Sequence, residues 1–408
     1  MGDILFLAHR VPFPPNRGDK IRSCNLLKKL VKLAPVHVGC FAESDEDRAG
    51  EGELKGIAAS HLAVSRTKPL VLAGAEAVLA GKPVSLTAFH SPRLADWVRE
   101  TVSEREIDAI FVFSGQMGQY VPADFAGRVV IDLCDVDSAK FESYAADGQR
   151  VWLNAREGRL LAREEERLAR RADATVLISE NEAELFRSRL RFPSQAELHV
   201  VGNGIDAGFF DPGAVAPHPG ILARPGPHFV FTGQMDYQPN EAAAIWALEH
   251  FLPLVRAHYP LAELHIVGRN PTRPLLSREG TPGLTIWGEV PDVRPFLAAA
   301  TCVIAPLQIA RGVQNKVLEA MAMARPVMVT PQAATGIAAQ DDTHWMVRNP
   351  DSEAMLKGVE TLLKSPEAVQ AMGRAARQFV LDHHDWDAML DPLEALLRGD
   401  HREARNAA

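Results

Sequence analysis

The chain has 408 residues, of which 47% are hydrophobic and 24% are charged, and its formal net charge is −8. This length exceeds one ordinary core and suits two or three domains, while the negative charge excludes a general nucleic-acid binder, which should be basic. The four cysteines are scattered and form no C-x-x-C pair, so nothing indicates a disulfide framework or a thiolate zinc site.

The first residues run from the acidic Asp3 directly into a short apolar stretch. A signal peptide needs a basic start, and a membrane-spanning helix needs about eighteen or more consecutive apolar residues, which no segment provides. We therefore expect a globular, cytoplasmic protein.

Short apolar runs alternate with charged helical segments along the first half of the chain. This alternation is typical of a parallel sheet wrapped by helices, and it predicts a doubly wound α/β domain. The runs that we expect to be strands are 4–9, 36–42, 109–114, 129–134, 174–179 and 197–202.

The same alternation restarts after a stretch rich in proline and glycine, which we interpret as an interdomain linker. We predict an N-terminal domain at 1–212, a linker at 213–228, a C-terminal domain at 229–382, and a crossing helix and tail at 383–408. The strands expected in the second domain are 229–233, 263–268, 284–288, 302–307 and 326–330.

Ligands of doubly wound sheets bind beyond the carboxyl ends of strands, where helix N-termini attract anions. After the first expected strand, three prolines stiffen a loop, Gly18 permits close backbone approach, and Asp19 is placed to cap a basic helix. This segment can line a substrate pocket, or it can be a plain connection followed by a solvated basic face. A basic helix of this kind can also rest on anionic lipid.

Two further candidates follow later strands. Asp132, Asp135 and Asp137 cluster after the strand at 129–134, where carboxylates can accept a proton, orient a hydroxyl or bind a metal. The alternative is that they cap the next helix and balance a lysine. The dipeptide Asn203-Gly204 is by itself a common turn signal.

The segment 312–330 combines a polar entry, a helix and an apolar strand. Backbone N–H groups beside Gly312 and at the helix start can hold a phosphate, Lys316 can add charge, and Glu319 can reach a pair of sugar hydroxyls. The structural alternative is that Glu319 is an ordinary acid in the first turn of a helix. The spacing of the residues leaves both open.

Six segments follow one another along the chain, namely "VVGNGIDAGFF", "FTGQMDYQPN", "LHIVGRNP", "IWGEVPDVRPFLAAA", "CVIAPL" and "NKVLEAMAMARPVMV". In this order and approximate spacing they resemble family 4 glycosyltransferases, which are retaining enzymes of the GT-B fold with two Rossmann-like domains facing across a cleft. Three segments, "FLAHRVPFPPNRGDKIRS", "IDLCDVDSAK" and "ARGVQNKVLEAMAMARPV", give a closer resemblance to bacterial sugar transferases associated with PEP-CTERM/exosortase exopolysaccharide loci.

The resemblance implies roles for several donor-binding residues. Glu319 matches the glutamate that holds the ribose hydroxyls, and Gly233 matches the glycine whose backbone lies near the diphosphate. Gly268 matches the turn whose following residues flank the base. Asn203 and Gly204 match the turn at the cleft floor, and Gly18 matches a glycine of the first loop.

The chain also departs from the family pattern. Arg311 stands where the first glutamate of the usual pair would be, and the usual arginine and lysine after the first strand of the C-terminal domain are missing. Arg311, Lys316 and Arg269 can replace that charge, because a guanidinium suits phosphate oxygens. Cys134 or Asp135 lies near the place of an absent histidine, and Asp135 is our candidate for orienting the donor sugar or accepting a proton.

The resemblance implies transfer of a hexosyl group, with retention and without a metal or other cofactor, from a nucleotide-diphosphate sugar to a glycan or lipid-linked acceptor. Expected partners are these substrates and the inner membrane surface, with no nucleic acid. Two alternatives stay open, a GT-B-fold sugar-nucleotide epimerase and a non-catalytic nucleotide-sugar-binding partner of a polysaccharide assembly. His383 and His384 are adjacent and point to different helix faces, so we predict no metal site there.

Overall fold

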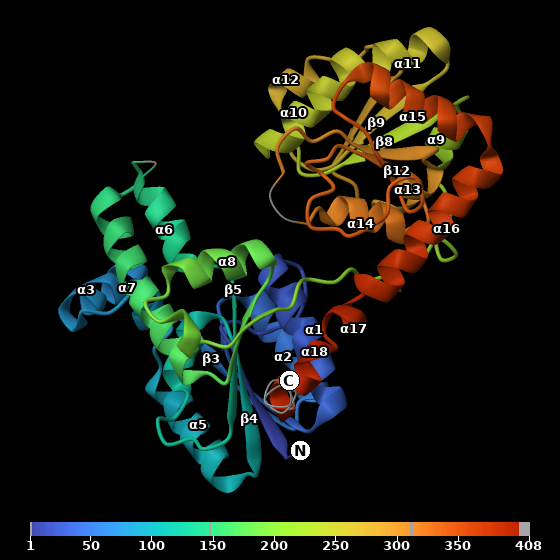
Figure 1. The fold of residues 1–408 in the computed structure, drawn as a ribbon. Helices are drawn as coiled ribbons and strands as arrows, with labels where there is room; N and C mark the ends of the chain where they lie inside the picture. Colours follow the sequence, from blue (N-terminus) through green and yellow to red (C-terminus); the bar gives the residue numbers. More distant parts are fainter. Residues whose placement is uncertain (1, 147, 311–312, 400–408) are drawn as a thin grey trace. The chain divides into compact units, whose positions relative to one another are not determined.

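The protein consists of two units, each built on one parallel sheet (Figure 1). The computed structural model describes residues 2–146, 148–310 and 313–399. One unit contains the chain up to Asn203 together with the segment from Met389, and the other contains Gly204–Ala388. The two sheets confirm the predicted α/β class with two doubly wound domains.

The first unit has seven parallel strands in the order β3-β2-β1-β4-β5-β6-β7. The strand order reverses between β1 and β4, which is where such sheets bind ligands. Its strands are β1 (Asp3–Ala8), β2 (Val36–Ala42), β3 (Ser60–Ser65), β4 (Ile107–Phe113), β5 (Arg128–Cys134), β6 (Ala174–Leu177) and β7 (Leu198–Val200). Its helices are α1 (Gly18–Leu33), α2 (Asp45–Ile57), α3 (Leu70–Ala80), α4 (Val84–Ala88), α5 (Pro92–Glu104), α6 (Asp137–Ala146), α7 (Val151–Arg171), α8 (Glu180–Arg189) and α18 (Pro392–Arg398).

The second unit has six parallel strands in the order β10-β9-β8-β11-β12-β13. Its strands are β8 (His228–Thr232), β9 (Glu263–Val267), β10 (Leu284–Gly288), β11 (Cys302–Ala305), β12 (Val327–Val329) and β13 (Met346–Val347). Its helices are α9 (Pro219–Leu222), α10 (Gln238–Trp246), α11 (Leu252–His258), α12 (Arg273–Leu276), α13 (Arg294–Ala299), α14 (Asn315–Ala322), α15 (Ser352–Lys364) and α16 (Pro366–His383), and α17 (Trp386–Met389) lies where the chain leaves this unit.

Apolar runs become central strands because both faces of a parallel sheet are covered by helices. Every residue of β2 and β8 is buried, for example. Two strands, β3 and β13, were not predicted. The stretch 213–228, which we expected to be a linker, contains α9 and belongs to the second unit, where Ile221 is fully buried.

The sequence allowed α1 a solvated basic face, but two of the cations of this helix are not exposed to solvent. Lys20 and Arg22 are each only 2% exposed, and both are paired with carboxylates. Lys20 Nζ donates to Asp47 Oδ1 over 2.8 Å, and Arg22 Nε donates to Asp132 Oδ2 over 2.9 Å. A buried charge is tolerated when it is paired and hydrogen-bonded in this way. Asp19 does not cap the helix, which begins one residue earlier, at Gly18.

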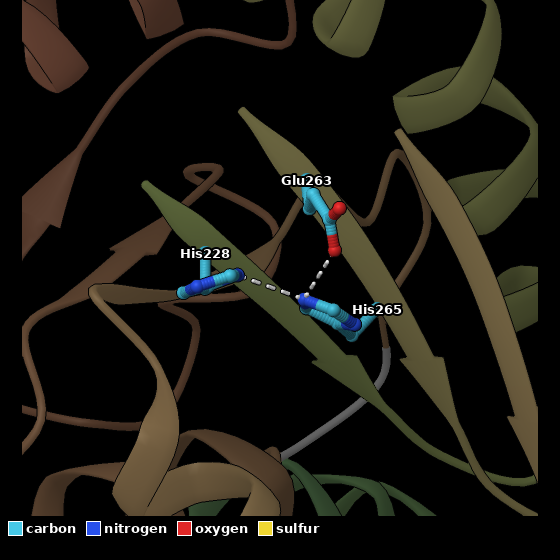
Figure 2. Close-up of side chains that lie close together, drawn as sticks. All are labelled: His228, Glu263 and His265. Atoms are coloured by element: carbon cyan, nitrogen blue, oxygen red, sulfur yellow. Dashed lines mark hydrogen bonds and ion pairs between the residues drawn. The ribbon is translucent and has the colours of Figure 1, made fainter. Parts of the chain in front are cut away.

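Figure 2 shows His265 of β9 beside His228 of β8 and Glu263, and His265 belongs to a chain of hydrogen bonds that also includes the half-buried Trp287 of β10. Trp287 Nε1 donates to His265 Nδ1 over 3.2 Å, so the neutral imidazole of His265 carries its proton on Nε2. That atom lies 3.1 Å from His228 Nδ1, and His228 Nε2 lies 3.1 Å from the carbonyl oxygen of Arg224. Burial, helped by the nearby His228, lowers the pKa of His265 to about 3.

None of the helices that the structure describes combines the length and the apolar character needed to cross a bilayer.

Acid should destabilise the protein through His265. Below pH 6.5, the ordinary pKa of histidine, the imidazole of His265 is protonated in the unfolded chain. In the folded protein the same imidazole stays neutral down to about pH 3. At pH 5 this difference costs roughly 2 kcal/mol of unfolding free energy, and above pH 7 it costs nothing. Urea unfolding at pH 7.5 and pH 5.0 should show His265→Gln losing less stability than the wild type. Equal losses in the two proteins would contradict this account of the buried histidine.

Two glycines of α2 should respond oppositely to alanine. A Cβ at Gly50 would lie 2.3 Å from the carbonyl oxygen of Phe13, whereas a Cβ at Gly52 meets nothing within 4 Å. Gly52→Ala should stabilise by about 1 kcal/mol because alanine is the better helix former. Gly50→Ala should destabilise by roughly 1–3 kcal/mol because the first loop must move. Chemical denaturation measures both, and stabilisation by Gly50→Ala would refute the packing of this loop on α2.

Candidate active site

A cavity of about 640 Å³ lies at the carboxyl ends of β8 and β9 in the second unit. It adjoins the point where the strand order reverses between β8 and β11, and the first residues of α14 form part of its wall. Doubly wound sheets bind ligands at this position, and the start of a helix favours an anion. The lining residues are Thr232, Gly233, Gln234, Asn240, Val267, Gly268, Arg269, Glu289, Val290, Val293, Val313, Asn315, Lys316 and Glu319.

Two glycines let the loops that build this cavity touch through their backbones. A Cβ at Gly268 would lie 1.6 Å from the carbonyl oxygen of Gly233, which no side chain could tolerate. A Cβ at Gly233 would lie 2.8 Å from Asn240 Nδ2 and 3.0 Å from Lys316 Nζ. The backbone N–H of Gly233 also donates to the carbonyl oxygen of Val267 over 3.1 Å. The two glycines are therefore required by space.

Lys316 is one of the two cations that line the cavity among the described residues, the other being Arg269. Its Nζ donates to Asn240 Oδ1 and lies 4.8 Å from the centroid of the Phe231 ring. Burial lowers the pKa of Lys316 to about 8, although the carboxylate of Glu319 opposes the change. The ammonium therefore stays largely protonated at neutral pH while it is held among poorly hydrated neighbours. A cation in such a place interacts strongly with an anionic ligand.

Glu319 lies beside Lys316 on α14 and lines the same cavity, and the alternative that it is an ordinary acid in the first helical turn does not hold. The helix begins at Asn315, so Glu319 is its fifth residue and not a member of the first turn. Its side chain lines the cavity while the apolar residues of α14, among them Val317 and Leu318, are buried in the core. Burial raises the pKa of Glu319, and the charge of Lys316 opposes that rise.

The mouth of the cavity is formed by two loops joined through side chains. Arg269 Nη2 donates to Gln234 Oε1 over 2.6 Å, and Asn270 Nδ2 donates to Asp236 Oδ2 over 3.1 Å. The backbone N–H of Met235 donates to the carbonyl oxygen of Arg269 over 2.9 Å. The guanidinium of Arg269 is thus held at the rim, where a phosphate can reach it.

The structure brings five of the predicted site residues together in this cavity. These are Gly233, Gly268, Arg269, Lys316 and Glu319. Arg311 and Gly312, which we predicted beside them, lie outside the described residues.

The predicted Asn203-Gly204 turn stands at the division between the two units. On the side of the first unit, Asn203 Oδ1 accepts a hydrogen bond from Arg22 Nη1 over 2.9 Å. In the second unit, a Cβ at Gly204 would lie 2.6 Å from the backbone of Trp386. This glycine is needed for close packing, and Trp386, 8% exposed, is the buried side chain it packs against.

The remaining predicted residues lie on the first unit. Gly18 begins α1, and a Cβ there would meet nothing within 4 Å, so space does not demand a glycine at this position. Asp132 is fully buried on Arg22 and is structural. Asp135 follows β5 and is exposed, whereas burial raises the pKa of Asp137. Asp135 is the most exposed of the three, while the side chain of Asp137 is 41% exposed and lies 3.9 Å from Lys140 Nζ.

Sequence reasoning missed a polar cluster at the carboxyl end of β1. His9 is 7% exposed, its ring stacks on Phe113, and its Nε2 lies 3.1 Å from Asp19 Oδ2. Burial would raise the pKa of Asp19, but hydrogen bonds from His9 and Arg10 lower it well below its usual range. His9 Nδ1 is buried and has no hydrogen-bond partner among the described residues. The sequence analysis placed His9 at the end of the strand expected at 4–9 and gave it no role.

Asn240 was also missed. It is 6% exposed in the first turn of α10, where Nδ2 donates to the carbonyl oxygen of Gln234 over 2.9 Å while Oδ1 accepts from Lys316. The amide thus fixes the ammonium relative to the loop after β8. From sequence alone, an asparagine near the start of a helix is most often interpreted as the residue that caps that helix.

Among the described residues, one group of side chains has the spacing of metal ligands, namely His228, Glu263 and His265. It lies at the amino ends of β8 and β9, the opposite edge of the sheet from the cavity. A metal on His265 Nε2 would force the imidazole proton onto Nδ1, which already faces the N–H of Trp287. The hydrogen-bond pattern therefore does not fit a metal at this place.

Two family models match this sequence. The model described as "Glycosyl transferase 4-like domain" matches residues 20–204, and the model described as "Glycosyl transferases group 1" matches residues 226–365. The two matches fall on the two units in chain order. No curated protein matches the sequence.

Solved structures share the fold at low identity. Sucrose-phosphate synthase from Thermosynechococcus elongatus is 16% identical, covers 100% of both chains and has a TM-score of 0.59. Anabaena HepE in complex with UDP is 15% identical over 97% of this chain and 100% of that chain, with a TM-score of 0.64. WaaG, a glycosyltransferase involved in lipopolysaccharide biosynthesis, is 17% identical over 96% and 98%, with a TM-score of 0.58. These likenesses bear out the predicted GT-B fold, and the two family matches support a glycosyltransferase of the family 4 type.

Proposed function

We propose that the protein transfers a hexosyl group, with retention, from a nucleotide-diphosphate sugar to a glycan or lipid-linked acceptor. The observation that carries this proposal is the gathering of Lys316, Glu319 and two glycine backbones in one cavity at a helix start. The motif resemblance to PEP-CTERM/exosortase-associated transferases supports a role in exopolysaccharide biosynthesis at the cytoplasmic side of the inner membrane.

The donor would lie in the cavity with its diphosphate against Lys316 and the start of α14. Ammonium and helix dipole both favour the two negative charges there. The carboxylate of Glu319, which lines the same cavity as Lys316, would accept hydrogen bonds from the ribose hydroxyls. The base would lie toward Val290 and Val293, which give that wall apolar surface.

The transfer step needs stabilisation of the leaving group. As the bond to the anomeric carbon breaks, that carbon gains positive charge and the departing nucleoside diphosphate gains negative charge. Preorganised cations and N–H groups near the phosphate stabilise this separation more than they stabilise the ground state. Lys316 supplies one cation, and Arg269 and Arg311 are our candidates for another, so no metal ion is part of the proposed step.

For the acceptor we propose residues of the first unit. Asp135 is the candidate that orients the donor sugar or accepts the proton of the acceptor hydroxyl, since it is the exposed carboxylate after β5. We also propose that Gly18 and the Asn203-Gly204 turn help to form the binding site for the sugar of the donor.

A non-catalytic nucleotide-sugar binder is the second candidate function. Arg311 stands where the resembling family has its first glutamate, and this departure is what favours the alternative. A binder would retain the donor but would neither transfer nor hydrolyse its sugar. Release of nucleoside diphosphate from a bound donor, measured over hours, separates the two functions.

Removing either charged group of the cavity should weaken donor binding. A donor at a hundred times its dissociation constant should stabilise the wild type by about 2.7 kcal/mol, seen as a thermal shift with the matching member of a UDP-, GDP- and ADP-sugar panel. Lys316→Ala should bind that donor about 10- to 100-fold more weakly, because a charged hydrogen bond contributes roughly 1.5–3 kcal/mol. Glu319→Ala should also bind the donor more weakly, because it loses the proposed hydrogen bonds from the ribose hydroxyls to the carboxylate.

The matched control is Lys357→Ala, at an exposed lysine of α15. It should leave both the thermal shift and turnover unchanged. The ribose assignment fails if Glu319→Ala keeps the full shift. The phosphate assignment fails if Lys316→Ala behaves like the Lys357 control.

A further inference from the structure

Helix α3 turns its apolar side chains outward. All of its leucines and valines are more than half exposed, from 51% for Leu72 and Val78 to 86% for Val71 and 89% for Leu79. A surface helix of a globular protein normally turns such residues inward. Figure 1 shows α3 at the edge of the first unit, beside α7. An apolar helix face of this kind marks a docking surface.

The orientation of α3 is fixed without help from its apolar face. Its buried side chains are the small Ala73 and Ala77. Thr87 Oγ1 donates to the carbonyl oxygen of Ala73 over 2.9 Å, and Arg156 Nη2 donates to that of Ala77 over 2.8 Å. Polar contacts therefore anchor one side, and the leucines and valines are left for something outside the unit.

The start of α7 continues the apolar surface. Trp152 is 68% exposed and lies one helical turn before Arg156, whose guanidinium also donates to the carbonyl oxygen of Lys82. Because residues four apart share a helix face, the indole is presented on the side of α7 that meets α3. Tryptophan is enriched where an apolar phase meets water.

Positive charge surrounds this apolar surface. Lys82 follows the end of α3, Arg150 precedes α7, and Arg159 and Arg163 lie further along the face of α7 that carries Trp152, and all four are exposed. The single acid of α3, Glu76, is paired with Lys68 over 2.8 Å. An apolar face with a tryptophan, flanked by lysine and arginine, is complementary to an anionic lipid surface.

We propose that α3 and the start of α7 rest on an anionic membrane surface, with Leu70, Val71, Leu72, Val78, Leu79 and Trp152 entering the headgroup boundary. This surface differs from α1, for which the sequence left lipid contact as one possibility and where Lys20 and Arg22 are buried. The inference is independent of the donor cavity and rests on the proposed function only in placing the enzyme where a lipid-linked acceptor is found.

Flotation with lipid vesicles tests the inference. The full-length protein is mixed with phosphatidylcholine vesicles containing 0 or about 30% phosphatidylglycerol, at low and at high salt. Wild type should float with the anionic vesicles, more weakly at high salt and least with the neutral vesicles. Val71→Glu/Leu79→Glu should bind at least about 10-fold more weakly, because the apolar residues are replaced by charges that the lipid repels.

The control is Leu222→Glu/Leu261→Glu, which places the same charges at exposed leucines of the second unit, 58% and 57% exposed. It should float like wild type. Both double variants should keep the thermal shift with nucleotide sugar, so loss of lipid binding is distinguished from loss of donor binding.

Three results would overturn the inference. The first is a wild type that stays in the soluble fraction at every lipid composition, and the second is a Val71→Glu/Leu79→Glu variant that floats as well as wild type. A third is that light scattering finds a wild-type dimer that this variant splits, with no lipid binding, in which case a second copy of the chain covers α3.

Discussion

The candidate site depends on the backbone contact between the loops after β8 and β9. Gly268 leaves no room for a side chain beside the carbonyl oxygen of Gly233, and Gly233 leaves none beside Lys316 and Asn240. These contacts place an ammonium, an amide and unshielded backbone within one cavity. A ligand phosphate can then approach N–H groups that side chains would otherwise cover. The rest of the second unit, with its sheet buried between helices, holds these loops in place.

A comparable constraint organises the first unit around one buried ion pair. Arg22 Nη2 lies 2.8 Å from Asp132 Oδ2 and also donates to the carbonyl oxygen of Val201 over 2.7 Å, while Nη1 donates to Asn203 Oδ1. Removal of one partner from such a pair leaves an uncompensated buried charge. This single guanidinium therefore ties α1, the end of β5 and the chain after β7 together, and so shapes the edge where His9 and Asp135 lie.

Much of the fold follows from local sequence pattern, because buried parallel strands are continuous apolar runs. β3 escaped prediction since "SHLAVS" mixes polar and apolar residues and its strand is only half-buried at the sheet edge. Gly233, Gly268 and Glu319 were predicted through motif order, and Lys316 and Arg269 as sources of charge for a phosphate. The pairing of Arg22 and the roles of Asn240 and His9 were not recognised. Arg22 meets Asp132 at a separation of 110 residues, and Lys316 meets Asn240 at 76. Local pattern carries no information about such pairs.

Diffraction from crystals soaked with UDP, GDP and ADP tests the central claim most directly. The account predicts a nucleotide in the cavity of the second unit, with a phosphate oxygen in hydrogen-bond range of Lys316 Nζ and the ribose hydroxyls on the carboxylate of Glu319. A nucleotide bound at any other place, with this cavity filled by side chains of the protein, would contradict it.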